Sequence, residues 1–457
     1  MLVKKRSIII LLLFSIILSF LYTYPASAGT PESYISQIKI NGTTTTLNPP
    51  AFISDGRTLV PVRFIVESSA LQGQVYWDES QQKVAMDCRG HYIELFIGRT
   101  QAKVDGRALT LDVAPTTWRD RTYIPLRFLV ENLGGQINWN DNTGAININF
   151  GAAPRVFAYY YYSPMAEMQA NSKLFSDIAF RWFETNGSGD LAYEYKDDYT
   201  AKIQWAHQQG IAAHASVMLM DKNELHQLLA SSTNRWHLIQ QLVSTASKSN
   251  YDGVNIDFEF IPSKDSAYFT QFLRDLKDSL GEKTLSVAVL ARTGNENWSI
   301  GTDYKAVGEI ADLVIIMAYD YSYVDTAPGP VAPLWWVQQV SQYTVSKIPR
   351  EKILLGLATY GYDWSGSGNG KTVTSATLKQ IQKTYKVQEH FDQKSMSPYY
   401  TYYDNQGRYH QIWMENQQSL TAKWNLCVDQ SLGGIAFWRI GTGFTDLYKL
   451  LAAQAKS

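Results

Sequence analysis

After residue 154, short apolar runs alternate with longer amphipathic stretches. Eight runs have the length and the β-branched or aromatic content of buried strands; they are residues 156–161, 177–183, 211–217, 253–260, 285–291, 313–319, 353–360 and 434–438. Stretches with helical spacing lie between them, among them residues 197–209, 235–249, 267–280 and 334–346. This alternation predicts parallel strands joined by helices. The predicted fold is α/β, a (β/α)8 TIM barrel with its chemistry at the carboxyl ends of the strands.

The alternation is interrupted at residues 397–415, between the seventh and eighth predicted strands. Aromatic and polar residues there flank the turn sequence Asp-Asn-Gln-Gly at residues 404–407. This pattern is typical of a hairpin and not of a helix. We expect a small α+β insertion that raises one wall of a cleft.

An internal repeat precedes the predicted barrel. DGRTLVPVRFIVE at residues 55–67 recurs as DRTYIPLRFLVE at residues 120–131, and the copies run on to Trp77 and Trp139. Proline favours the start of a helix, and the alternating residues that follow favour a hairpin. Each copy therefore predicts a short helix and then a hairpin, in a small α+β domain over residues 35–150.

This N-terminal segment resembles the small domain first named from copper amine oxidases, through its repeated Pro-x-Arg-Phe core. The name implies no copper chemistry here, because the segment has no cluster of metal-ligand residues. We expect the domain to attach the protein to a cell wall or polymer, or to act as a spacer.

Residues 1–28 have the pattern of a signal peptide. Three cations at residues 4–6 precede an uncharged apolar run at residues 7–22, and Ala-Ser-Ala at residues 26–28 is a small-x-small cleavage site. The alternative is an uncleaved membrane anchor, for which the run is short. We expect a secreted protein, or one associated with the wall or spore, with no integral membrane association after cleavage.

Charge and cysteine content exclude several function classes. The formal net charge is −1, which argues against electrostatic binding of nucleic acid. The two cysteines, Cys88 and Cys427, fall in different predicted domains, so a disulfide framework is not expected. No Cys/His cluster has zinc-ligand spacing, and we predict neither a metal site nor a cofactor.

The residues with the clearest chemical signal lie on the fourth predicted strand. Side chains alternate along a strand, so Val254, Ile256 and Phe258 face one way and the polar residues face the other. The apolar set suits the helix layer, and the polar residues Asn255, Asp257 and Glu259 are expected to point into the barrel. Burying three polar side chains lowers stability unless they satisfy one another's hydrogen bonds. Their presence on a core strand therefore indicates either a functional site or a hydrogen-bonded network without chemistry.

This part of the chain resembles glycoside hydrolase family 18 over about residues 155–455. The family motif D-x-x-D-x-D-x-E corresponds to residues 252–259, with Asn255 in place of the second aspartate. Met-Ala-Tyr-Asp at residues 317–320 matches the family's M-x-Y-D, and Trp438 stands where the family has a tryptophan under the sugar. The insertion is similar to that of bacterial spore and cell-wall glucosaminidases.

The resemblance implies roles for individual residues. Glu259 is expected to be the general acid and base, Asp257 to orient the substrate's acetamide group, and Tyr319 to stabilise the acetamide and the oxazoline formed from it. Further substrate-binding residues are expected to be Asn255, Asp320 and Trp438. Asn255 can hydrogen-bond Asp257 but cannot share a proton with it as a paired aspartate would, so we expect Asp257 to be more readily ionised.

The resemblance implies a retaining, substrate-assisted hydrolase that cuts β-1,4 bonds at N-acetylglucosamine. The partner would be a polysaccharide that contains this sugar, and we predict the peptidoglycan of a spore cortex or cell wall. Chitin or its oligomers are the alternative substrate. A barrel that binds glycan without cutting it is the non-enzymatic alternative, and the presence of Glu259 disfavours it.

Overall fold

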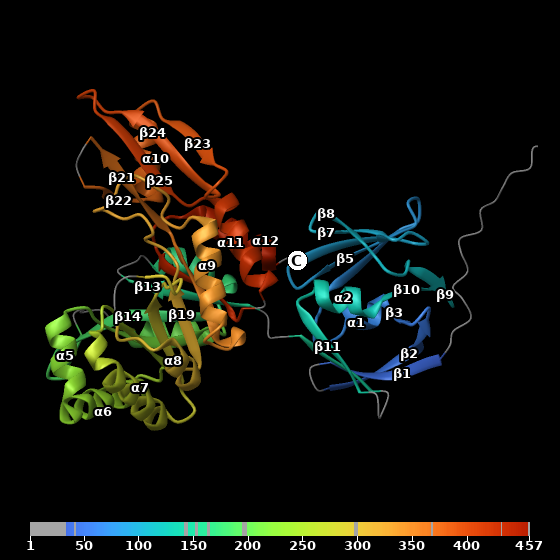
Figure 1. Ribbon diagram of the computed structural model, residues 1–457, viewed down its shortest axis with the longest axis horizontal. Helices are drawn as coiled ribbons and strands as arrows, with labels where there is room; N and C mark the ends of the chain where they lie inside the picture. Colours follow the sequence, from blue (N-terminus) through green and yellow to red (C-terminus); the bar gives the residue numbers. More distant parts are fainter. Residues whose placement is uncertain are drawn as a thin grey trace, which may run out of the picture.

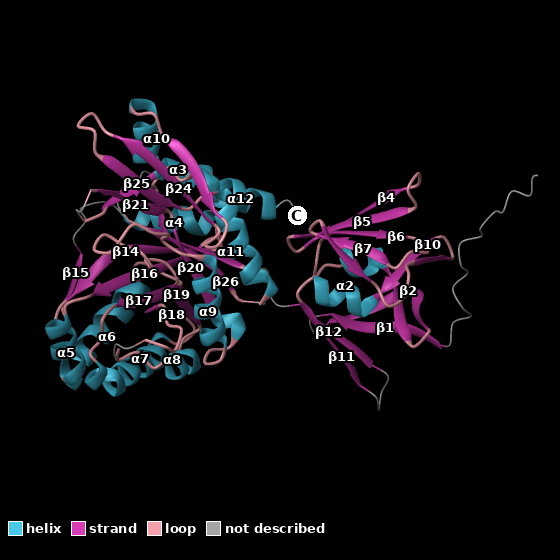
Figure 2. Cartoon of the chain, turned by 45° about the horizontal axis from the view of Figure 1, so that its top comes forward, coloured by secondary structure: helices cyan, strands magenta, loops and turns pink. Residues whose placement is uncertain are grey.

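A computed structural model describes residues 33–40, 43–140, 145–150, 154–161, 165–193, 199–296, 300–366, 369–430 and 432–455. The expected signal peptide, residues 1–28, lies outside them. A β-rich N-terminal domain precedes a larger domain of helices around a barrel (Figures 1 and 2). No helix among the described residues is both long and apolar enough to cross a membrane.

The larger domain is a closed barrel of eight parallel strands, as predicted. In chain order they are β13 (Arg155–Tyr160), β14 (Asp177–Thr185), β16 (Ala212–Leu219), β17 (Gly253–Phe258), β18 (Thr284–Leu290), β19 (Leu313–Met317), β20 (Ile353–Ala358) and β26 (Gly434–Ile440). The barrel closes because β13 pairs with both β14 and β26. A short strand, β15 (Leu191–Tyr193), extends β14 in the antiparallel sense.

Helices surround the barrel, and four of them lie where the sequence predicted: α4 (Tyr199–Gln208), α6 (Ser232–Lys248), α7 (Ser266–Leu280) and α9 (Leu334–Val345). The others are α3 (Met165–Ala170), α5 (Lys222–Ala230), α8 (Tyr304–Ile310), α11 (Gln417–Asp429) and α12 (Thr445–Ala455). Alternate strand residues pack against this layer. Phe258 of β17, for example, stacks on Phe272 of α7 with ring centroids 5.7 Å apart. The opposite faces of the strands fill the barrel interior.

The insertion between the seventh and eighth barrel strands is larger than the hairpin that the sequence indicated. It contains β21 (Tyr360–Ser365), β22 (Lys371–Thr374), α10 (Ser375–Thr384), β23 (Gln388–Asp392), β24 (Ser397–Tyr403) and β25 (Tyr409–Met414). The hairpin of β24 and β25 is confirmed. The first strand, β21, starts only two residues after β20 ends, so no turn signal separates them in the sequence. In Figure 1 this sheet lies above the barrel.

The N-terminal domain consists of two sheets and two short helices. One sheet contains β1 (Ser33–Ile40), β2 (Thr43–Ser54), β3 (Arg57–Pro61), β9 (Thr116–Trp118), β10 (Arg121–Pro125), β11 (Gly135–Asn140) and β12 (Ala145–Phe150). The other contains β4 (Gln74–Asp78), β5 (Lys83–Cys88), β6 (His91–Phe96), β7 (Gln101–Val104) and β8 (Arg107–Thr110).

The sequence repeat is a structural repeat. Pro61 precedes α1 (Val62–Val66) and Pro125 precedes α2 (Leu126–Asn132), and a hairpin follows each helix, as predicted. The strands that lead into the two helices, β3 and β10, pair antiparallel. The two copies of the repeat therefore contact each other through the strands that carry their most similar residues.

The base of the insertion is joined to the helix layer by a buried ion pair. Lys423 of α11 lies 2.7 Å from Glu415, which follows β25, and their side chains are 0% and 2% exposed. Removing one partner of a buried pair leaves the other charge without compensation.

We therefore expect Lys423→Met to lower the free energy of unfolding by about 3–5 kcal/mol, as measured by urea denaturation. The double variant Lys423→Met, Glu415→Leu should recover most of this loss. Lys449→Met is the control, because its pair with Asp446 is exposed and should contribute less than about 1 kcal/mol. A Lys423→Met protein as stable as wild type would contradict this account.

Candidate active site

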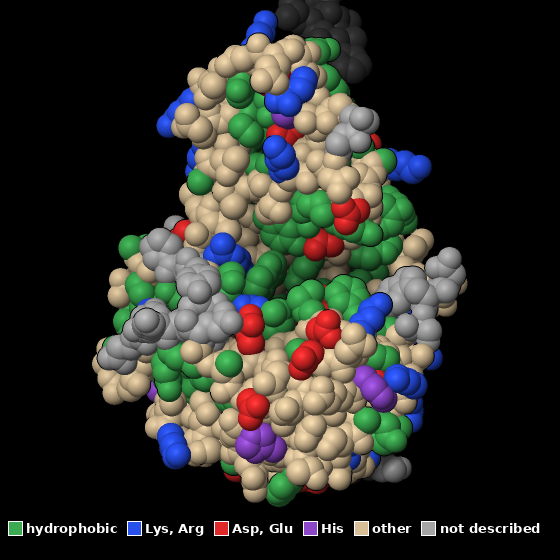
Figure 3. Space-filling model, turned by 90° about the vertical axis from the view of Figure 1, so that its left-hand side faces the viewer, with side chains coloured by type: hydrophobic (Ala, Val, Ile, Leu, Met, Phe, Trp, Pro, Cys, Tyr) green, Lys and Arg blue, Asp and Glu red, His purple; other side chains and the backbone are tan. Residues whose placement is uncertain are grey.

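A pocket of about 920 Å³ lies at the carboxyl ends of the barrel strands. Figure 3 looks onto its mouth, where hydrophobic side chains gather in a hollow with carboxylates at its edge. The barrel strands and the loops that follow them supply most of its wall, and Tyr360 and Tyr362 of the insertion strand β21 add to it. The pocket therefore lies where chemistry was predicted, and the insertion extends one wall.

Asn255 lies deepest in the stack on β17 and faces the barrel interior, as predicted. Its side chain is fully buried: Ser216 donates a hydrogen bond of 2.9 Å to its Oδ1, and its Nδ2 donates one of 3.0 Å to Ser286. The amide thus links β17 to both neighbouring strands. Among the described residues the amide bonds these two hydroxyl groups, and no hydrogen bond from Asn255 to Asp257 is seen.

Asp257 lies above Asn255 and lines the pocket. It is only 6% exposed, and its Oδ1 has no hydrogen-bond partner among the described residues. Burial raises the pKa of this carboxyl, and the positive charge of Arg181 opposes the rise. That Asn255 leaves Asp257 more readily ionised than a paired aspartate would stays a prediction, and burial acts against ionisation at this position.

Glu259 follows the end of β17 and faces the same pocket. Burial is the main cause of its raised pKa, and the negative charges of Asp257 and Asp320 raise it further. A carboxyl group in this environment keeps its proton closer to neutral pH than a free glutamate does. It can therefore donate a proton to a group bound in the pocket.

Tyr319 and Asp320 enter the pocket from the end of β19. Both line it although they are consecutive, because Asp320 has a left-handed backbone conformation with φ of 59°. Tyr360 and Tyr362 donate hydrogen bonds of 2.8 and 2.9 Å to the Asp320 carboxylate. Burial raises the pKa of Tyr319, so its hydroxyl remains a hydrogen-bond donor.

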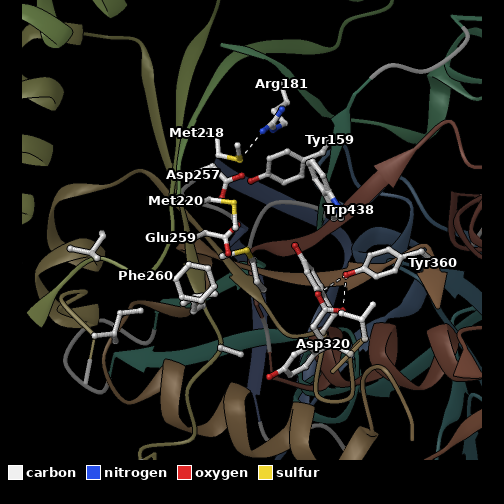
Figure 4. A pocket seen from close by; sticks show the side chains of 18 of the residues that line it. Tyr159, Arg181, Met218, Met220, Asp257, Glu259, Phe260, Asp320, Tyr360 and Trp438 are labelled. Atoms are coloured by element: carbon white, nitrogen blue, oxygen red, sulfur yellow. Dashed lines mark hydrogen bonds between the residues drawn. The ribbon is translucent and has the colours of Figure 1, made fainter. Parts of the chain in front are cut away.

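Trp438, at the end of β26, forms an aromatic wall with two tyrosines. Its ring centroid lies 5.6 Å from that of Tyr159 and 6.0 Å from that of Tyr161, which it stacks against at 29°. Figure 4 shows Trp438 and Asp257 on the same pocket, with the Tyr159 hydroxyl turned toward Asp257. A flat indole beside polar groups is suited to binding a sugar ring.

The structure thus places Asp257, Glu259, Tyr319, Asp320 and Trp438 together in one pocket. Asn255 lies beneath them as a buried link between strands, and no pocket contact is seen for it.

Sequence reasoning missed several lining residues: Tyr159, Arg181, Met218, Tyr360 and Tyr362. Arg181 left a signal, since it is a charged residue within an otherwise apolar predicted strand. Tyr360 and Tyr362 left none, because their strand belongs to an insertion that the sequence did not resolve from the barrel. Among the described residues, no group of three His, Cys, Asp or Glu side chains is placed to hold a metal ion.

The raised pKa of Glu259 has a consequence for stability. The folded protein binds this proton more tightly than the unfolded chain, in which the pKa is near 4.5. Ionising Glu259 therefore costs stability as the pH rises from that value toward the folded-state pKa, by about 1.4 kcal/mol for each unit of difference. Glutamine carries no charge at any of these pH values.

We expect Glu259→Gln to become more stable than wild type as the pH rises from about 4 to 8, as measured by urea denaturation. Glu309→Gln is the control, because Glu309 is an exposed partner of Lys305 and should show no such growing difference. A difference that stays constant, or that shrinks with rising pH, would refute the raised pKa.

Comparison with known proteins identifies both domains. Residues 155–443 match the model of Glycosyl hydrolases family 18, which is more than half of the chain. Residues 39–148 match the model of the Copper amine oxidase N-terminal domain.

Similar proteins include enzymes of spores. The cortical fragment-lytic enzyme of Bacillus anthracis is 31% identical over 233 residues, which are 49% of this chain and 54% of that protein. The chain thus spans about half the length of this relative.

Solved structures agree with the family match. The spore cortex-lytic enzyme SleL of Bacillus cereus is 28% identical with a TM-score of 0.61, over 66% of this chain and 74% of that one. A chitinase from Chromobacterium violaceum is 26% identical with a TM-score of 0.62, over 67% of this chain and 100% of that one. The chain therefore belongs to glycosyl hydrolases family 18, with a copper amine oxidase N-terminal domain before its barrel, and is a glycoside hydrolase.

Proposed function

We propose that this hydrolase cuts β-1,4 bonds at N-acetylglucosamine in the peptidoglycan of a spore cortex or cell wall, by a retaining, substrate-assisted mechanism. The observation that carries the proposal is the pair of Asp257 and Glu259 in one pocket, with the pKa of Glu259 raised by burial and by neighbouring carboxylates. A protonated acid beside a second carboxyl suits this mechanism, in which the substrate supplies its own nucleophile.

In the first step, Glu259 donates its proton to the glycosidic oxygen as the bond from that oxygen to the anomeric carbon breaks. The acetamide oxygen of the same sugar bonds to the anomeric carbon and forms an oxazolinium ion. Asp257 accepts a hydrogen bond from the acetamide N–H, which aligns the oxygen and stabilises the positive charge. The Tyr319 hydroxyl donates to the acetamide group and restricts it to the attacking geometry.

In the second step, the Glu259 carboxylate takes a proton from a water molecule, which attacks the anomeric carbon and opens the oxazolinium ring. Two displacements at the same carbon restore its original configuration. Trp438 would carry the sugar ring on its indole face, and Asp320 would bind a polar group of the substrate. Asn255, two residues before Asp257, ties β17 to the neighbouring strands β16 and β18.

The relatives support a wall polymer as the substrate. A cortical fragment-lytic enzyme and a spore cortex-lytic enzyme are both similar to this chain. Chitin is the second candidate, because a chitinase has the same barrel at a comparable identity. Export through a signal peptide at residues 1–28, and attachment to the wall through the N-terminal domain, would bring the enzyme to either polymer outside the cell.

We expect the wild-type protein to release fragments with new reducing ends at N-acetylglucosamine from purified spore-cortex peptidoglycan, and Glu259→Gln to release them at least about 100-fold more slowly. Mass spectrometry of the reduced products identifies the cleaved bond. Vegetative peptidoglycan and chitin oligomers are digested in parallel.

Glu309→Gln, a change of the same type on the surface, should digest like wild type. Release from chitin oligomers alone would replace peptidoglycan by chitin as the substrate. Equal release by wild type and Glu259→Gln would reject Glu259 as the acid.

The stereochemical outcome tests the mechanism separately. If the acetamide oxygen is the nucleophile, the first product has the β configuration at its new reducing end, which proton NMR detects before mutarotation. An α product formed first would require direct attack by water, and would leave Asp257 without the role proposed here.

A further inference from the structure

Arg181 is a buried cation on the wall of the pocket. It lies on β14 with its side chain 6% exposed, and Figure 4 shows it next to Met218 and on the same side of the pocket as Asp257. Its guanidinium carbon lies 4.7 Å from the ring centroid of Tyr161. The aromatic face and the surrounding strands hold the charge in a fixed position.

The direct partners of Arg181 are weak for a buried charge. One guanidinium nitrogen donates to the sulfur of Met218 at 2.7 Å and to a carboxylate oxygen of Glu184 at 3.3 Å. A thioether is a poor acceptor, and Glu184 is 36% exposed, so solvent screens this ion pair. A buried cation needs stronger compensation than these contacts give.

A buried carboxylate on the same side of the pocket can supply that compensation. Asp257 is almost fully buried, and its Oδ1 has no hydrogen-bond partner among the described residues. The side chain beneath it, Asn255, is neutral and bonded to Ser216 and Ser286. Among the described residues, Arg181 thus has only a solvent-screened carboxylate as its ion-pair partner, Asp257 has an unpaired carboxylate oxygen, and both line the same pocket.

We infer that Arg181 is a positioning residue whose buried positive charge keeps Asp257 in its anionic form. This inference rests on the proposed function, in which Asp257 must accept a hydrogen bond from the acetamide N–H. A protonated Asp257 would lose the charge that stabilises the oxazolinium ion. The chain thus balances this carboxylate from β14, which β16 separates from β17, whereas the motif on β17 itself has the neutral Asn255.

The other groups that face Asp257 cannot do this. Glu259 after β17 and Asp320 after β19 are acids, and a negative charge cannot favour the anionic form of Asp257. Tyr159 of β13 and Tyr319 after β19 are phenols whose pKa is raised by burial, so both are neutral. Met218 of β16 is uncharged.

Among the described residues, Lys222 also lines the pocket as a cation, and it is exposed. Arg181 is the cation that lowers the pKa of Asp257, against the rise caused by burial. An exposed ammonium is screened by water and contributes little to a buried carboxylate.

The test is a titration of Asp257 by carbon-13 NMR of labelled aspartate carboxyl groups, in the full chain with Glu259→Gln present so that the neighbouring acid does not titrate. Asp257→Asn identifies the signal. We expect Arg181→Met to raise the pKa of Asp257 by about one unit or more, since an opposite charge within a few ångströms lowers a carboxyl pKa by about 1–3 units. Arg181→Lys keeps the charge and should retain most of the effect.

Glu184→Gln is the matched control. It removes the surface partner of Arg181 but leaves the cation, so the pKa of Asp257 should not rise. In proteins with Glu259 intact, the acidic limb of the pH profile of kcat/KM on a chromogenic N-acetylglucosamine oligomer should move to higher pH in Arg181→Met. The same limb should stay near its wild-type position in Arg181→Lys.

An unchanged titration of Asp257 in a folded Arg181→Met protein would overturn the inference. The NMR result does not depend on catalysis, so it stands even if the wild type cuts no glycan, an outcome that would refute only the proposed function. Conversely, an equal loss of kcat at every pH, with the titration unmoved, would show that Arg181 is needed only for packing.

Discussion

The burial of ionisable groups inside a barrel of parallel strands is the constraint on which the site depends. Asp257 and Glu259 leave β17 on its inner face, where water is largely excluded and the strands hold side chains in fixed positions. Burial opposes their ionisation and so raises the pKa of each carboxyl. The same burial strengthens the effect of each neighbouring charge or hydroxyl on these pKa values, because little solvent screens the interaction.

The other residues of the pocket change how strongly burial raises the pKa of each carboxyl group. Tyr360 and Tyr362 donate to Asp320 and favour its ionised form, while Arg181 opposes the protonation of Asp257. Proximity of the carboxylates in turn favours the protonated form of Glu259. The three carboxyl groups thus experience different surroundings within one cavity, and such divergence separates acids from bases in hydrolase sites.

The insertion and the N-terminal repeat are two units of the fold whose local sequence patterns are also seen in the tertiary structure. The insertion contributes two tyrosines to the pocket and is fixed at its base by the buried pair of Lys423 and Glu415. The N-terminal repeat forms two similar halves because each proline ends a strand and starts a helix at an equivalent position. Both units use the antiparallel pairing that short, turn-rich segments favour.

The sequence by itself determined the eight barrel strands, four of the surrounding helices, the repeated helix and hairpin, and the inward-facing stack on β17. These features follow from periodicity and turn residues, which act between neighbours in the chain. Alternation on β17 also pointed to Asp257 and Glu259, and the resemblance to family 18 motifs pointed to Tyr319, Asp320 and Trp438.

Only the tertiary structure decided which groups compensate one another. Arg181 and Asp257 lie 76 positions apart in the sequence, and Tyr360 reaches Asp320 from a different element, so no local pattern could pair them. The bonds of Asn255 depend on hydroxyls of two other strands, Ser216 and Ser286. Ionisation and hydrogen bonding inside a barrel are set by the residues that closure brings together, and spacing along one strand does not reveal them.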